Sequence, residues 1–177
     1  MLHQQPSNAR DMPASPRWPQ YALLEGMADA LMEPVAASNP EGETCDARLG
    51  RVASEVRNAL LSRRDAARVF AGTDPLSENV LRVGSLLISC LKEAGADDRI
   101  ASWGAFTLVY FVIGFVIEEQ GLGRTKEPAG QEKNSLAAKF PLAAIAMREI
   151  AGANANQRFA FGLDLQIVGL KAAIRRS

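Results

Sequence analysis

The longest uninterrupted run of apolar and small residues lies between Ile100 and Ile117, where no side chain is charged. Apolar groups recur there at every angle of a helical wheel, which predicts a helix that must be buried on all sides. Two acidic residues, Glu118 and Glu119, end the apolar character of the run. The pattern therefore predicts one central helix over 100–120, with the other elements covering it.

The same run reaches the lower limit of a membrane-spanning helix, which is roughly 17 to 25 residues. Small and polar residues dilute it, and no cluster of Lys or Arg flanks it to set an orientation in a bilayer. These features favour the central helix of a globular domain. A membrane-associated protein is the weaker alternative.

Amphipathic spacing predicts two helices before residue 61. The first begins at Tyr21 and ends at Pro34, because proline interrupts a helix. After a turn-rich linker over 35–46, a second helix turns its apolar residues inward, among them Leu49, Val52, Val56, Ala59 and Leu60. Its opposite face carries Arg48, Arg51, Glu55 and Arg57 and is expected to be solvated.

Turn residues divide the next part of the chain. A short helical segment over 64–71 is closed by Gly72, and a longer helix begins near Pro75 and ends before Gly95. Asp97 or Asp98 is expected to cap the central helix, and Gly121 to terminate it. Each helix boundary therefore has its own stop or start residue.

Residues 121–138 mix glycine, charge and proline without periodicity, which predicts a loop. Pro141 is expected early in another helix, through Ile150, and Asn154 or Asn156 starts the last one. No strand pattern of period two appears in the sequence. The predicted fold class is therefore all-α.

Composition allows a single domain: the chain has 177 residues and equal numbers of acidic and basic side chains. Residues 1–20 contain four prolines and no periodicity, so we expect a disordered or extended tail there and one domain over 21–177. A neutral chain lacks the basic patch of a nucleic-acid binder. The absence of a signal-peptide pattern points to the cytoplasm.

The residues that usually carry chemistry are scarce in this chain. Cys45 and Cys90 lack metal-ligand spacing, and idle thiols are favoured over a disulfide or a site. The lone histidine, His3, lies outside the predicted fold, so no metal, cofactor or histidine-based catalysis is expected. Glu118 and Glu119 point about 100° apart on a helix and do not form an acid/base pair. The sequence predicts a protein that is not an enzyme.

Four segments occur in a familiar order: YALLEGMADAL, NALLSRRDAARVFAGTDP, AFTLVYFVIGFVIEEQ and RFAFGLDLQIVGL. Together they resemble the C-terminal ligand-binding and dimerisation domain of the tetracycline-repressor (TetR) family, over about 21–174. The most specific parts are LLSRRDAARVFAGTDP, similar to the family's LLxxRDGAKVxLGTRP, and the FGLxLxxxGL pattern that begins at Phe161.

The resemblance implies a homodimer in which the central and final helices pair with their copies in a four-helix interface. The residues expected there are Ile113, Ile117, Phe161, Gly162, Leu165, Val168 and Gly169. The alternative, that both helices fill the core of a monomer, stays open. Family members also carry an N-terminal helix-turn-helix, and residues 1–20 do not contain one, so DNA binding is expected only if such a unit is supplied.

The resemblance also implies a ligand pocket, because the tetracycline repressor holds magnesium-bound tetracycline between helices. Where the family has its metal-ligating histidine, this chain has Phe70, so magnesium-tetracycline binding is not expected. The implied lining is Val52, Val56, Phe70, Thr73, Leu87, Ile88, Phe106, Tyr110 and Glu118. Such a lining suits a small apolar or aromatic effector with one or two hydrogen-bonding groups. The alternative is that these side chains pack together without a cavity.

These expectations give two functional hypotheses. The first is a ligand-responsive TetR-family transcriptional regulator, expected to be a repressor, in which effector binding near the central helix repositions the helix that begins at Tyr21. The second is a stand-alone dimerising module that binds a small molecule and does not bind DNA. The identity of the effector and the operator sequence do not follow from the sequence.

Overall fold

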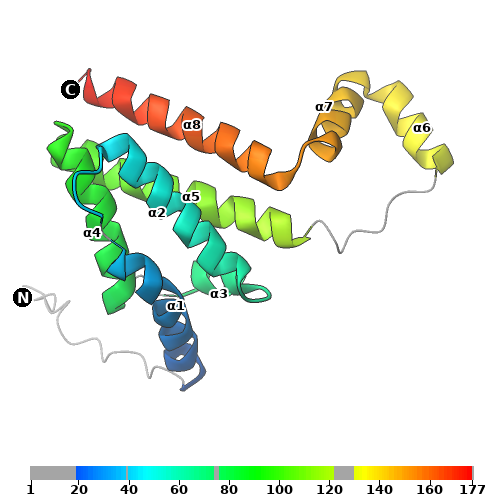
Figure 1. Ribbon diagram of the computed structural model, residues 1–177. Coiled ribbons are helices and arrows are strands. Elements are labelled where there is room, and N and C mark those ends of the chain that lie inside the picture. Colours follow the sequence, from blue (N-terminus) through cyan, green and yellow to red (C-terminus); the bar gives the residue numbers. More distant parts are fainter. Residues whose placement is uncertain (1–18, 39, 74–75, 122–129, 177) are drawn as a thin grey trace, which may run out of the picture.

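The computed structural model describes residues 19–38, 40–73, 76–121 and 130–176, and its element labels follow Figure 1. The helices are α1 (Pro19–Ala37), α2 (Cys45–Leu61), α3 (Ala66–Ala71), α4 (Glu78–Glu93), α5 (Asp98–Gly121), α6 (Gly130–Lys139), α7 (Pro141–Gly152) and α8 (Ala155–Ile174). No strand occurs in these ranges, which confirms the all-α class. Most of the tail predicted over 1–20 lies outside the described residues.

Helix α5 is central, as predicted, and α2, α3, α4 and α8 pack around it. It begins where Asp97 Oδ1 accepts a hydrogen bond from the Ile100 N–H at 2.6 Å, which confirms the predicted cap. Its inward face is closed, with Leu108 at 1% exposure. Its opposite face is open, with Trp103 68% and Tyr110 65% exposed. The prediction of burial on all sides is therefore wrong for one subunit.

By length and composition, α5 is also the one helix in the described part of the chain that is apolar enough to cross a membrane. A third of its most apolar window is buried inside the molecule. The buried third lies against the helices that surround α5. The apolar character of the remaining surface still requires cover of some kind.

Helix α1 continues past Pro34 to Ala37, so the predicted end was wrong. Pro34 is exposed, and the helix loses only the one hydrogen bond that the proline nitrogen cannot donate. Beyond it, Val35 is 2% exposed and packs in the core next to Met32. Burial of that turn outweighs the local cost of the proline. The helix also begins at Pro19 instead of Tyr21, and proline is favoured in a first turn.

Three predicted boundaries are confirmed. Gly72 caps α3, Gly95 follows α4 with a φ of 97°, and α5 ends at Gly121. A left-handed φ is unfavourable for other residues, which explains a glycine at position 95. Helix α4 begins at Glu78, after Ser77, so the start predicted near Pro75 was early by one turn.

The loop predicted over 121–138 is wrong in its second part, because α6 forms from Gly130 to Lys139. This helix carries no apolar stripe, so periodicity could not reveal it. Helix α7 follows, and α8 then begins with a capping box in which the Asn154 side chain accepts from the Gln157 N–H at 2.9 Å. That box confirms Asn154 as the start of the last helix.

Figure 1 shows α6 and α7 beyond the N-terminal end of α8, away from the body formed by α1 to α5. Helix α7 has no buried residue, and α6 is the element it contacts most. Helix α8 lies along α5 and buries Phe159 and Leu163. The molecule therefore consists of a packed body, a long helix against it, and an arm that projects.

Candidate functional site

Five of the residues predicted to line a pocket come from α2, α3 and α4, which pack near one another and against α5. Val52, Val56 and Leu87 are 0%, 3% and 1% exposed and belong to one buried cluster. Phe70 and Ile88 are partly buried and pack against that cluster. The structure thus brings five of the predicted lining residues into one core. In this conformation their side chains pack directly on the core.

The two aromatic residues predicted from α5 lie elsewhere. Phe106 and Tyr110 are 47% and 65% exposed, on the open face of the helix. Their ring centroids are 5.9 Å apart, so they form one aromatic patch with each other. The structure does not bring this patch into the Val56 cluster. A helix that is apolar all round gives no sequence signal for which face meets the pocket.

The two predicted polar contacts are both engaged within the chain. The Thr73 hydroxyl donates to the Phe70 carbonyl oxygen at 2.8 Å, at the end of α3. Glu118 accepts from the Arg158 guanidinium at 3.3 Å, which ties α5 to α8. Thr73 remains next to Phe70 and the cluster, whereas Glu118 faces the α5–α8 contact.

Two cavities open at the edges of the body. One, of about 400 Å³, lies where α2 meets α3 and is lined by Leu61, Arg63, Arg64, Asp65 and Gln120. The other, of about 500 Å³, lies between α1 and α4 and is lined by Ala36, Glu78, Leu81, Arg82, Ser85, Leu86 and Ser89. Neither cavity is lined by a residue of the predicted pocket.

Arg57 is a buried charge that sequence reasoning missed. The charged face of α2 was expected to be solvated, yet Arg57 is only 8% exposed. Its guanidinium donates to both Glu119 oxygens at 2.7 and 3.0 Å, and to Asn156 Oδ1 at 2.8 Å. It also lies 4.8 Å from the ring centroid of Phe159. One arginine thereby joins α2, α5 and α8, and this cation–π contact helps to compensate for its burial.

The residues predicted for a subunit interface divide into two groups. Phe161, Leu165 and Val168 of α8 are 69%, 55% and 56% exposed and form an apolar outer face. Ile113 and Ile117 of α5 instead pack against the chain's own core.

The two glycines predicted for that interface differ from each other. A Cβ on Gly162 would lie 2.6 Å from the Phe111 ring, so this glycine allows close packing of α8 on α5 inside the subunit. A Cβ on Gly169 would have no neighbouring atom within 4 Å. Close approach at Gly162 therefore serves the contact with Phe111 in the same chain.

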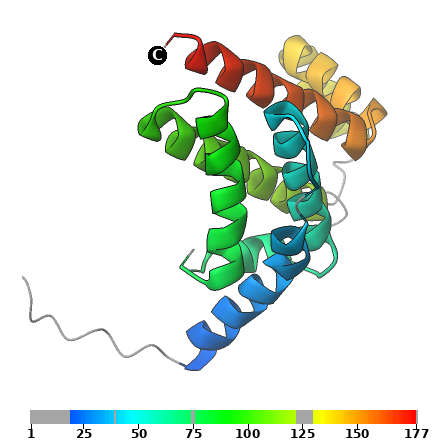
Figure 2. The same cartoon turned by 60° about the vertical axis from the view of Figure 1, so that its left-hand side comes forward.

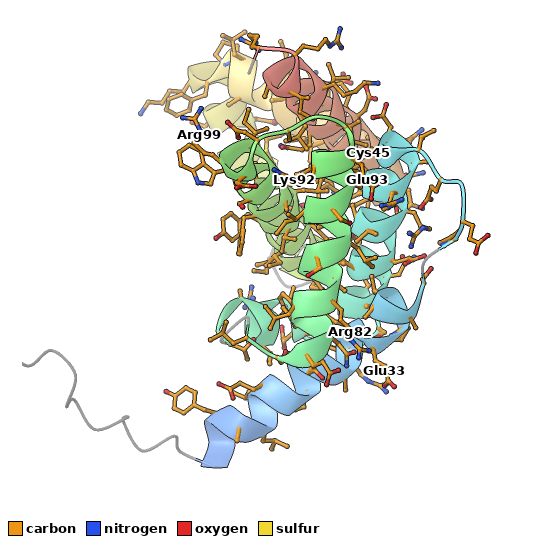
Figure 3. All side chains as sticks on the ribbon, turned by 90° about the vertical axis from the view of Figure 1, so that its left-hand side faces the viewer. Glu33, Cys45, Arg82, Lys92, Glu93 and Arg99 are labelled. Atoms are coloured by element: carbon orange, nitrogen blue, oxygen red, sulfur yellow. The ribbon has the colours of Figure 1, made fainter. Side chains whose placement is uncertain are left out.

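The two cysteines lie together at the ends of α2 and α4 (Figure 3 labels Cys45). Both thiols are free, and Cys90 Sγ donates to the Cys45 carbonyl oxygen at 3.7 Å. Burial is the main factor that raises the pKa of each thiol. Thiols with raised pKa values are poor nucleophiles at neutral pH. Among the described residues, no three His, Cys, Asp or Glu side chains are grouped as metal ligands.

Comparison with known proteins gives consistent matches. Residues 38–174 match the family described as "Tetracyclin repressor-like, C-terminal domain". The tetracycline repressor protein class A from transposon 1721 of Escherichia coli is 33% identical over 153 residues, which are 84% of this chain and 69% of that protein.

Two solved structures extend the likeness to the fold. A possible TetR family transcriptional regulator from Streptomyces coelicolor A3(2) has a TM-score of 0.75 and 31% identity, covering 87% of this chain and 78% of that one. A TetR variant from Acinetobacter baumannii AYE in complex with minocycline has a TM-score of 0.62 and 27% identity, covering 86% of this chain and 70% of that one.

Proposed function

The chain belongs to the tetracycline repressor-like C-terminal domain family, and we propose that it is an effector-responsive regulator of transcription. The observation that carries this proposal is the match over residues 38–174, which spans the helices from α2 to α8. The relatives are named as repressors and as a transcriptional regulator, which supports a regulatory role without catalysis. We assign the protein to the cytoplasm, where such a regulator would meet DNA.

The proposed effector is a small apolar or aromatic molecule that enters the region around Val56. The side chains there are hydrocarbon or aromatic, and the Thr73 hydroxyl beside Phe70 supplies a polar contact at the edge. Phe70 offers no ligand to a hard cation, so the proposed effector is not a magnesium chelate. Binding requires the packed side chains to separate, because Val52, Val56 and Leu87 are fully buried.

A second copy of the chain is the proposed cover for the open faces of α5 and α8. Trp103, Phe106 and Tyr110 on α5 and Phe161, Leu165 and Val168 on α8 together expose more large apolar side chains than a monomer usually does. Helix α7 adds Leu142 and Met147, which are 81% and 64% exposed. A symmetric dimer would bury all three faces. Phe106 and Tyr110 could then contribute to a site that two chains complete.

The proposed mechanism is a shift in population between two positions of α1. Effector binding among α2, α3, α4 and α5 would favour one position, and a helix-turn-helix attached to α1 would read DNA in the other. Repression is the direction we propose, by analogy with the relatives. A stand-alone dimerising module that binds an effector without binding DNA is the second candidate, supported by the zero net charge.

A thermal-shift screen of planar aromatic compounds tests the effector site. A compound present at 100 times its Kd should stabilise the wild-type chain by about 2.7 kcal/mol. Val56→Trp, which fills the cluster, should abolish that gain, whereas Leu76→Trp at a 68% exposed position should retain it. Binding that survives Val56→Trp would locate the effector elsewhere. Minocycline that binds only with added Mg²⁺ would contradict the exclusion of a chelate.

A second measurement separates the two candidates. The chain, joined at its N-terminus to a TetR-family helix-turn-helix, is titrated with the operator duplex of that unit at about 150 mM salt, where nonspecific phosphate contacts are weak. DNA binding that the aromatic compound relieves supports the regulator. Aromatic binding without any DNA binding supports the stand-alone module.

A further inference from the structure

Helix α1 is anchored along only part of its length. In its C-terminal half, Ala28, Met32 and Val35 are 1% to 2% exposed and face the core. In its N-terminal half, Tyr21, Leu23 and Met27 are 50%, 65% and 48% exposed. Figure 2 shows this half extending past the other helices of the body. The boundary between the anchored and projecting halves lies at Ala28 and Asp29.

At that boundary, Asp29 binds the first turn of α4. Its Oδ1 accepts from the Asn79 backbone N–H at 2.7 Å, and its Oδ2 accepts from Asn79 Nδ2 at 2.9 Å. Asn79 is the second residue of α4, where a backbone N–H has no partner inside the helix. Ser77, the N-cap residue, makes no side-chain cap bond. The cap of α4 is therefore supplied by a residue of α1.

The charge of Asp29 suits this position. Burial acts to raise the pKa of Asp29, but the hydrogen bonds from Asn79 and neighbouring groups outweigh it and hold the pKa below its ordinary 3.8. The carboxylate is thus ionised at neutral pH, and a helix N-terminus attracts negative charge. The bond between α1 and α4 is charge-assisted, which makes it stronger than a neutral hydrogen bond.

The other end of α4 reaches the proposed effector site. Leu87 is buried in the Val56 cluster, and Ile88 packs against it. Both residues lie on the same continuous helix as Asn79, which runs from Glu78 to Glu93. A helix of this length moves as a rigid rod, so a displacement at Leu87 also displaces its first turn. The first turn is where Asp29 holds α1.

We propose that Asp29 is the positioning residue that transmits a displacement of α4 to the projecting half of α1. The proposal rests on the proposed function in that the effector supplies the displacement. Rotation of α4 about its own axis, or a shift along it, moves the Asn79 donor groups. The Asp29 carboxylate moves with these donors, and the N-terminal half of α1 moves with Asp29. The apolar contacts of Met32 and Val35 form the pivot, because they lie on the anchored side of Asp29.

The test uses hydrogen–deuterium exchange of the full chain without any effector. Asp29→Ala should speed exchange of the α1 amides and of the first turn of α4 about tenfold, since a cap bond is lost. Helices α2 and α5 should keep their exchange rates. The matched control is Asp164→Ala, an exposed acid on α8 that should change neither region. Unchanged exchange in α1 with Asp29→Ala would overturn the proposal.

A second pair of variants tests transmission. Ile88→Trp enlarges a side chain at the cluster and replaces the effector as the source of displacement. It should change α1 exchange in the wild-type background and have no such effect when combined with Asp29→Ala. An equal change in both backgrounds would show that apolar packing carries the signal, which would overturn the role of Asp29. If Ile88→Trp does not fold, Val83→Leu, at another buried position on α4, takes its place.

Both measurements are independent of effector binding. Failure of every aromatic compound to bind would count against the proposed function and leave the exchange results intact. Conversely, binding abolished by Val56→Trp together with no effect of Asp29→Ala would retain the proposed function and remove Asp29 from it.

Discussion

Helices α5 and α7 are both apolar, yet they differ in how much of their surface is buried. On α5, one face is closed by four neighbouring helices, and Leu108, Val112 and Val116 are at most 1% exposed. On α7, no residue is buried, and Leu142 is 81% exposed. Apolar composition therefore predicts that a surface will be covered, but it does not say by which chain. The inner face of α5 is covered within the subunit, whereas α7 and the outer face of α5 are left exposed.

The largest effect is expected from removing a side chain on the inner face of α5. Leu108→Ala should lower the free energy of unfolding by about 2–5 kcal/mol, because a buried leucine leaves a cavity. Ile145→Ala on α7 should cost less than about 0.5 kcal/mol in the isolated subunit, where its side chain is half exposed. Urea unfolding at submicromolar concentration measures both. Equal costs would contradict the difference between the two helices.

The next effect concerns association. Phe161→Glu adds a charge to the exposed apolar face of α8 and should weaken the dimer about 30-fold or more, the loss typical of an interface hot spot. Ala160→Glu, on a neighbouring exposed position of α8, is the control and should have little effect. Sedimentation equilibrium at micromolar concentration reports the change. A wild-type chain that is only monomeric would contradict the proposed dimer.

A smaller effect separates the inner and outer faces of α8. Gly162→Ala would bring a Cβ to 2.6 Å from the Phe111 ring, and such overpacking should cost about 1–3 kcal/mol. Phe111 cannot withdraw freely, because it stacks on Phe159 at 5.5 Å. Gly169→Ala meets nothing within 4 Å and should stabilise the helix by about 0.5–1 kcal/mol. Thermal unfolding of the two variants gives opposite signs if the faces are assigned correctly.

The smallest effect is the pH dependence of the stability that the Asp29 carboxylate contributes. Because the folded-state pKa of Asp29 is below 3.8, its ionised form stabilises the fold above that pH, and the contribution disappears as pH falls through the folded-state value. Wild type should exceed Asp29→Ala in stability by about 1 kcal/mol at pH 7, the usual size of a helix cap. The difference should shrink below pH 4. A constant difference between pH 3 and pH 7 would argue against a charged cap.

Much of the fold follows from local sequence signals. Gly72, Gly95 and Asn154 mark real helix boundaries, because each relies on backbone geometry or a side-chain cap within a few residues. Pro34 gave a wrong boundary, since its local cost is smaller than the burial gained by Val35. Local signals fail where tertiary packing outweighs them.

The site was harder to predict than the fold. Val52, Val56 and Leu87 lie together in one buried cluster, but Phe106 and Tyr110 lie on the open face of α5. A helix apolar on every side carries no periodic signal that would distinguish these faces. Arg57 was missed because its partners, Glu119 and Asn156, lie far away in the sequence. Asp29 was missed because its role depends on the first turn of another helix.

The Arg57 contacts also bear on the order in which the chain folds. Arg57 and Asn156 are 99 residues apart, so their hydrogen bond closes a long loop. Closing such a loop lowers the conformational entropy of the chain before any contact contributes favourable free energy. Non-local contacts therefore form slowly. Helix α8 should therefore dock after α2 and α5 have packed. In a newly made chain, the apolar outer face of α8 would therefore be positioned last. This order shortens the time during which that face is exposed on an incomplete fold.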